Sequence, residues 1–196
     1  MSRLFSSALL LLLVISFQGC GNDDDHLFTM LNKSSTNINF QNTLFEDGPL
    51  NVANYIYFYN GGGVAIGDIN SDGLQDILFT GNMVKNRLYL NKGNFKFEDI
   101  TDKSGVASKQ GWCMGATMAD VNGDGKLDVY ICRSADIRPE LRSNLLFINN
   151  GDLTFSEKAA QYGLADTGYS TQASFFDYDK DGDLDLFVGS YIDFDV

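Results

Sequence analysis

Histidine and basic residues are scarce in this sequence of 196 residues, and each shortage argues against a class of function. The single His disfavours a His-ligated metalloenzyme and His-based acid–base catalysis. The 14 Lys and Arg residues are outnumbered by 26 Asp and Glu residues, which gives a formal net charge of −12. The chain therefore has no electrostatic attraction for nucleic acid or for an anionic membrane surface, and we expect no nucleic-acid partner.

Long apolar runs are also lacking, because the run Ala8–Ile15 is too short for a comfortable membrane span. Arg3 precedes it, and the string "SFQGC" follows, ending at Cys20. A small residue followed by Cys at this place resembles the lipobox of bacterial lipoproteins, in which the Cys is lipidated and becomes the mature N-terminus. The resemblance predicts a lipoprotein signal peptide over residues 1–19 and lipidation of Cys20. The alternative is an ordinary secretory signal cleaved nearby.

Residues 20–40 are expected to form a flexible acidic tether, opened by the string "GNDDDH" (21–26). Directly after the Cys, this string resembles the acidic export signal of surface-exposed lipoproteins, and a plain disordered linker is the alternative. We expect an outer-membrane lipoprotein of the cell envelope, exposed at the surface and attached to the membrane through its lipid anchor only. Otherwise the protein is secreted.

Cysteine is also sparse, since only Cys113 and Cys132 remain after Cys20. An even pair in an oxidising compartment makes a disulfide across adjacent strands one alternative. Two free thiols are the other, because side chains on opposite faces of a sheet cannot bridge. Neither residue is marked as a nucleophile.

Three acidic strings recur along the chain at spacings of about fifty residues, a period typical of repeat architectures such as propeller blades. They are "DINSDGLQD" (68–76), "DVNGDGKLD" (120–128) and "DYDKDGDLD" (177–185). A second repeat is interleaved, because "NRLYLNKGNFKFED" (86–99) aligns with "NLLFINNGDLTFSE" (144–157). Both strings predict a strand, an Asn-x-Gly turn and a strand. Because such a hairpin comes after each pair of strands that an acidic string connects, each repeat is predicted to have four short strands.

The residues that flank the acidic strings also indicate strands. An apolar triplet follows each string, at 77–79, 129–131 and 186–188, and small residues precede each one. Such triplets are typical of buried strands, and small side chains suit the innermost strand of a blade. A helical turn is predicted only near Glu157–Tyr162 outside the signal region. The fold class is therefore all-β, a β-propeller of four-stranded blades.

The predicted propeller occupies residues 41–196, and about three blades are present. Propellers typically need four to eight blades. We therefore expect this sequence to be the N-terminal part of a longer propeller, incomplete at the C-terminus.

Each acidic string carries side-chain oxygens at positions 1, 3, 5 and 9 and a Gly at position 6. In a tightly curled loop alternating side chains point inward, and Gly allows a positive φ that other residues resist. The residue at position 7 can then turn its carbonyl inward. Hard oxygen donors in a flexible ring of about six or seven suit Ca²⁺, whereas Mg²⁺ prefers a smaller octahedron and soft metals prefer His or Cys.

We therefore predict three Ca²⁺ ions, about one per loop. The ligands are Asp68, Asn70, Asp72, Leu74 and Asp76; Asp120, Asn122, Asp124, Lys126 and Asp128; and Asp177, Asp179, Asp181, Asp183 and Asp185, with Leu74, Lys126 and Asp183 binding through backbone carbonyls. An EF-hand begins with the same letters but needs a Glu at position 12 and flanking helices. Position 12 is occupied here by Phe79, Ile131 and Val188, which excludes an EF-hand. A solvated Asp-rich turn explains one string but not three alike.

The strings "GGGVAIGDINSDGLQD", "GATMADVNGDGKLD" and "FFDYDKDGDLD" resemble FG-GAP/VCBS repeats, the calcium-loop blades of integrin-α-like β-propellers. The interleaved "NRLYLNKGNFKFEDIT" resembles bacterial relatives of cartilage acidic protein, which carry an ASPIC/UnbV domain. The resemblance covers roughly residues 55–190, and the ASPIC/UnbV segment is not present in this chain. It implies a seven-bladed propeller in the full protein, with loop Ca²⁺ ions that stiffen each blade.

The expected function is recognition or adhesion through a calcium-binding, surface-anchored propeller whose ligand is an extracellular glycan or protein. We expect no enzyme activity. Two alternatives stay open: a non-catalytic part of a secreted carbohydrate-active enzyme, and a structural component of an envelope assembly. Outside the acidic loops, Trp112 is either a sugar-stacking platform or, as favoured, a core residue, and Arg138, Glu140 and Arg142 are either functional or part of a solvated loop.

Overall fold

A computed structural model describes residues 27–46, 48, 50–108, 110–136 and 138–191. The chain divides into two units, 1–31 and 32–196, and every element below belongs to the second. The expected signal peptide, the lipidation site Cys20 and the string 21–26 lie outside the described residues. Among the helices of the described part, none has the length and apolar character needed to cross a membrane.

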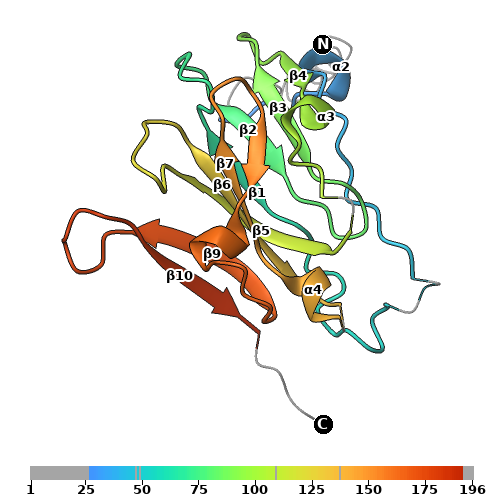
Figure 1. The fold of residues 1–196 in the computed structure, drawn as a ribbon. Coiled ribbons are helices and arrows are strands. Elements are labelled where there is room, and N and C mark those ends of the chain that lie inside the picture. Colours follow the sequence, from blue (N-terminus) through green and yellow to red (C-terminus); the bar gives the residue numbers. More distant parts are fainter. Residues whose placement is uncertain (1–26, 47, 49, 109, 137, 192–196) are drawn as a thin grey trace, which may run out of the picture. The chain divides into compact units, whose positions relative to one another are not determined.

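The second unit is built from antiparallel strands in sequence order, which confirms the all-β prediction (Figure 1). Two sheets have four strands each and a third has two. Blade 1 comprises β1 (Val64–Gly67), β2 (Asp76–Phe79), β3 (Arg87–Asn91) and β4 (Phe97–Asp99); blade 2 comprises β5 (Trp112–Ala119), β6 (Asp128–Ser134), β7 (Leu145–Asn149) and β8 (Phe155–Glu157); the third unit comprises β9 (Ser170–Phe176) and β10 (Asp185–Ser190). The predicted apolar triplets lie in β2, β6 and β10.

Short helices of four residues accompany the strands. They are α2 (Lys33–Thr36), α3 (Thr101–Ser104), α4 (Pro139–Arg142) and α5 (Ala159–Tyr162). The helical turn predicted near Glu157–Tyr162 is confirmed by α5, whereas α3 at the same place in blade 1 was not predicted. Both end at a Gly with positive φ, at Gly105 and Gly163, because a left-handed residue closes the last turn.

Residues 32–40, which the sequence assigns to the tether, belong to the packed unit. Asn39 accepts a hydrogen bond from the Tyr89 hydroxyl at 2.9 Å, and the Phe40 ring stacks on Phe79 with centroids 5.0 Å apart. These contacts hold the segment against blade 1, so packing begins before residue 41.

Glycine residues lie where the first strands of neighbouring blades approach one another most closely. A side-chain carbon at Gly63 would lie 2.8 Å from the Gly115 Cα, and one at Gly115 would lie 2.6 Å from the Thr171 carbonyl oxygen. Only residues without a side chain allow this approach. The Thr80 hydroxyl adds a link between blades by donating to the Met114 carbonyl. The prediction that small residues line the convergence of the innermost strands is thus confirmed.

Two hydrophobic clusters form the core. One is centred on residues such as Leu78, Val106 and Ile131, and the other contains Trp112 and Tyr130. Trp112 is 3% exposed and packs against Tyr55 and Phe58. The interpretation of Trp112 as a core residue is confirmed, and its ring face is not a platform for stacking a sugar.

Cys113 and Cys132 are free, buried thiols, so the alternative of a disulfide between them is not realised in this structure. Cys113 packs in the first cluster and Cys132 in the second. Burial raises the pKa of both thiols, that of Cys132 to about 12. A thiol with a raised pKa is a poor nucleophile, which agrees with the absence of any sequence signal for reactivity.

Candidate metal centres in the acidic loops

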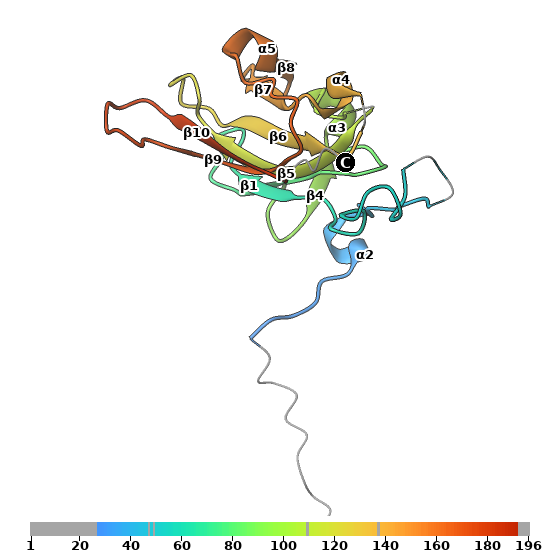
Figure 2. The same ribbon diagram turned by 90° about the horizontal axis from the view of Figure 1, so that it is seen from below.

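Each acidic string connects the first strand of its unit to the second. Loop 1 (68–76), loop 2 (120–128) and loop 3 (177–185) follow β1, β5 and β9, and their last residues begin β2, β6 and β10. Figures 1 and 2 show the three connections at the same end of the strands. A direct contact joins blade 1 to blade 2, because the Asn149 side-chain amide donates to the Ile69 carbonyl at 2.8 Å.

The loops share two left-handed residues. The Gly at position 6 has φ of 85° at Gly73, 82° at Gly125 and 98° at Gly182, as predicted from its conformational freedom. Position 4 is also left-handed, with φ of 61° at Ser71 and 65° at Lys180. The sequence did not reveal position 4, since only loop 2 has a Gly there.

Loops 1 and 2 have nearly the same hydrogen bonds. The position-1 carboxylate accepts from the backbone N–H groups of positions 5 and 6, at 3.1 and 2.7 Å for Asp68 and at 3.0 and 2.8 Å for Asp120. The position-5 carboxylate accepts from the N–H of position 7, at 2.8 Å for Asp72 and 2.9 Å for Asp124. Repeated sequence thus produces a repeated set of oxygens that is held by the backbone.

A lysine supplies part of the positive charge in loop 2. The Lys126 ammonium lies 3.0 Å from a carboxylate oxygen of Asp124, and this hydrogen bond holds the pKa of Asp124 below its ordinary value. The sequence predicts Lys126 as a ligand only through its backbone carbonyl. That role, like those of Leu74 and Asp183, stays a prediction.

The position-9 carboxylates of loops 1 and 2 are buried, in contrast to the side chains at positions 1, 3 and 5. Asp76 is 0% exposed and Asp128 is 1% exposed. Asp76 accepts from the N–H groups of Ile69 at 3.0 Å and Asn91 at 2.7 Å. Asp128 accepts the equivalent bonds from the N–H groups of Val121 at 3.1 Å and Asn149 at 2.8 Å. Desolvation raises the pKa of both carboxyls, and these backbone hydrogen bonds act against it.

Two asparagines that the ligand prediction did not include complete this arrangement. Asn91 donates from its side chain to the Gln75 carbonyl at 2.9 Å, and Asn149 donates to the Leu127 carbonyl at 3.1 Å. Each also accepts the N–H of the Gly two residues later, which forms the predicted Asn-x-Gly turn. The signal was present, because the two interleaved strings align Asn91 with Asn149. Their distance along the chain from the acidic loops concealed the contact.

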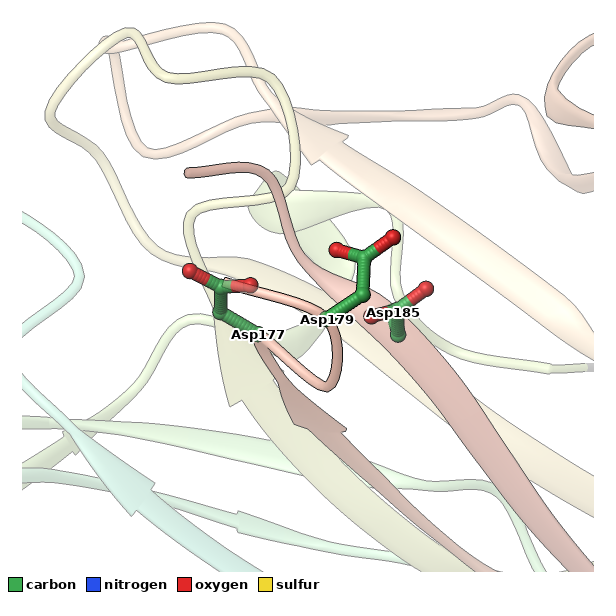
Figure 3. A group of neighbouring side chains, drawn as sticks. All are labelled: Asp177, Asp179 and Asp185. Carbon is green, nitrogen blue, oxygen red and sulfur yellow. The ribbon is translucent and has the colours of Figure 1, made fainter. Parts of the chain in front are cut away.

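Loop 3 brings three carboxylates together. Ligand oxygens of Asp177, Asp179 and Asp185 all lie within 4.8 Å of one another, and the three side chains are exposed (Figure 3). In the described part of the chain, no other set of three carboxylate, thiol or imidazole groups meets that distance. Asp181 instead accepts the Asp183 N–H at 3.1 Å.

Comparisons with known proteins agree with the repeat. A family model described as "FG-GAP-like repeat" matches residues 68–131 and 137–188, which together contain all three loops. Cartilage acidic protein 1 of Xenopus tropicalis is 32% identical to the chain over 134 residues, covering 67% of this chain and 20% of that protein. The chain therefore spans about a fifth of the length of the curated relative that it matches.

Proposed function

This chain belongs to the FG-GAP-like repeat family, and on that basis we propose that it is part of a calcium-stabilised, surface-anchored β-propeller that recognises an extracellular glycan or protein. The observation that carries the proposal is the convergence of Asp177, Asp179 and Asp185 in a loop whose sequence occurs three times. A repeated ligand set on neighbouring blades supports a scaffold role for the metal, and a recognition role for the whole.

The residues of loop 3 fit Ca²⁺. Three carboxylates within 4.8 Å of one another are hard, charged oxygen donors, and no nitrogen or sulfur donor lies among them. Asp177, Asp179 and Asp185 would hold the ion there. In loops 1 and 2 the corresponding ligands would be Asp68, Asn70 and Asp76, and Asp120, Asn122 and Asp128, together with the predicted ligands at positions 5 and 7. The ion supplies positive charge that offsets the mutual repulsion of the carboxylates.

The proposed role of calcium is to stabilise the fold, since ligands that converge only in the folded loop couple metal binding to folding. At a free concentration of 100 times Kd, each site would add about 2.7 kcal/mol to the free energy of unfolding. The purified protein should therefore melt at a higher temperature in excess Ca²⁺ than in chelator. Equal midpoints would overturn the calcium proposal.

Variants in loop 3 make this test specific. Asp177→Asn combined with Asp179→Asn removes two charges from the converging set and should reduce the calcium-induced shift. Asp99→Asn is a matched control, because this exposed carboxylate pairs with Arg87 outside the loops, at 3.0 Å. Its calcium-induced shift should equal that of the parent protein.

Binding rather than catalysis is proposed because FG-GAP-like repeats are typical of recognition modules, and three candidate groups outside the loops lack catalytic character. The buried thiols Cys113 and Cys132 have raised pKa values. The pair Arg138 and Asp136 is a bidentate ion pair, with both distances 3.0 Å. Trp112, the earlier candidate for sugar stacking, belongs to the core.

Anchoring at the cell surface through Cys20 is the second part of the proposal. Cys20→Ser should release the protein from the membrane fraction, because serine cannot form the thioether-linked lipid. Continued retention of the variant in membranes would contradict lipidation. Residues 1–26 lie outside the described part of the structure, so the support for this anchor is the sequence.

A further inference from the structure

A pocket of about 350 Å³ lies at the strand ends opposite the acidic loops. It is lined by the connection after β2, with Asn82 and Lys85, and by the approach to β5, with Ser108 and Gln110. The segment after β6 contributes Asp136. The acidic loops precede β2 and β6 and follow β5, so these lining residues are at the other end of the same strands. The volume is in the range of pockets that hold small ligands.

The charges that face this pocket differ from those of the whole chain. Lys85 is exposed and makes no hydrogen bond or ion pair with the described residues. The charge of Asp136 is compensated, because both its oxygens accept from the Arg138 guanidinium at 3.0 Å. That pair also holds the pKa of Asp136 below its ordinary value. The uncompensated charge at the pocket is therefore positive, in a protein of net charge −12.

A second cation lies behind the pocket wall. Arg133 is 6% exposed, and its guanidinium donates to the carbonyls of Ser143 at 3.1 Å and Gln110 at 2.6 Å. Its Nε has no hydrogen-bond partner, and no carboxylate of the described residues forms an ion pair with it. Gly111, a lining residue, lies directly against this guanidinium, because a side-chain carbon at Gly111 would lie 2.4 Å from the Arg133 Nε.

A buried guanidinium without a counter-charge is unfavourable, and its field is weakly screened by a low-dielectric wall. An anion in the pocket would receive direct contact from Lys85 and the field of Arg133 through Gly111. A neutral polar group is also present, since the Gln110 side chain is exposed. The Ser108 hydroxyl donates to the Gln110 carbonyl at 2.8 Å and can only accept a hydrogen bond from a ligand. Asn82 contributes no free donor, because its amide already donates to the carbonyls of Gly61 and Cys113.

We propose that this pocket binds the carboxylate of an acidic sugar residue, with Lys85 as its direct ionic partner. The inference rests on the proposed recognition function and names its ligand class. A sugar is favoured over an acidic peptide because loops bound the pocket on several sides. A compact ring with one charge and several hydroxyls suits such a site better than an extended chain, which binds along a groove or strand edge.

The test is a calorimetric titration of the calcium-loaded full chain with galacturonate, with neutral galactose and with oligoglutamate. Galacturonate should bind, and Lys85→Met should weaken its binding about tenfold or more. Lys92→Met is the matched control: it removes the same charge at the β3–β4 turn, where Lys92 faces Glu98 at 3.7 Å, and it should leave the affinity unchanged.

Three outcomes would overturn this inference: no binding of galacturonate, including binding of oligoglutamate alone; equal loss of affinity in both lysine variants; or binding of galactose with the same affinity as galacturonate. A calcium-dependent melting shift is measured separately in the same samples. Failure of the sugar titration with that shift intact therefore rejects the ligand class, whereas loss of the shift rejects the calcium-stabilised scaffold.

Discussion

Asn149 is predicted to contribute more to stability than its repeat counterpart Asn91. Asn149 is 3% exposed and makes three side-chain hydrogen bonds, of which the one to Ile69 crosses between blades. Asn91 is half-buried and makes two, both within blade 1. The two positions thus form a natural comparison, in which the inter-blade contact and the degree of burial are the differences.

The magnitude follows from these contacts. Each hydrogen bond contributes about 1 kcal/mol net, and a buried carbonyl left without a donor costs about 1–3 kcal/mol. Asn149→Ala should therefore lower the free energy of unfolding by about 3–4 kcal/mol. Asn91→Ala should lower it by about 1–2 kcal/mol, because water replaces part of what is lost. In a domain of this size the larger loss corresponds to a melting temperature about 6–16 °C lower.

Urea unfolding at fixed free calcium measures both variants. The midpoints should fall in the predicted order with the m-value unchanged, since a lost contact changes stability and not the area exposed. Asn149→Asp should be at least as destabilising as Ala, because it turns an oxygen toward the Ile69 and Leu127 carbonyls. Equal losses at 91 and 149 would refute the reasoning that a hydrogen bond between blades contributes to stability.

Three further predictions concern close packing, backbone strain and thiol burial. Gly115→Ala should lower the free energy of unfolding by about 2 kcal/mol, because the new methyl group would lie 2.6 Å from a carbonyl oxygen of β9; an unchanged urea midpoint would show that the strands separate freely. Lys180→Gly should raise it by about 0.5–1 kcal/mol by relieving a left-handed φ of 65°, and a lower melting temperature would contradict this. In a Cys20→Ser background, Cys113 and Cys132 should react with a thiol reagent at neutral pH only after unfolding, as mass spectrometry of the labelled protein would show; rapid labelling of the native protein would disprove their burial.

The strands and loops were predictable because their determinants are local. An apolar triplet after each acidic string predicts a buried strand, and the Gly at position 6 predicts a positive φ that Gly73, Gly125 and Gly182 all adopt. The convergence of small residues at the first strands followed in the same way. Repetition strengthened each inference, since the same pattern had to fit more than one unit.

What escaped prediction depends on contacts between distant parts of the chain. The burial of Asp76 and Asp128 arises where a strand from the outer hairpin closes over the loop, and the Asn91 and Asn149 amides complete that closure. Pairing register decides these contacts, and a single sequence does not specify it. Lys180 at positive φ escaped for another reason, because a non-Gly residue gives no sign of a left-handed backbone.

Gly63 and Gly115 would affect the width of the central channel if such blades closed into a ring. The circumference at the innermost strands equals the number of blades multiplied by the spacing between neighbouring first strands. The close backbone approach at these two glycines keeps that spacing small between the described blades. In a closed ring, a larger residue at either position would widen the central channel as well as strain the contact.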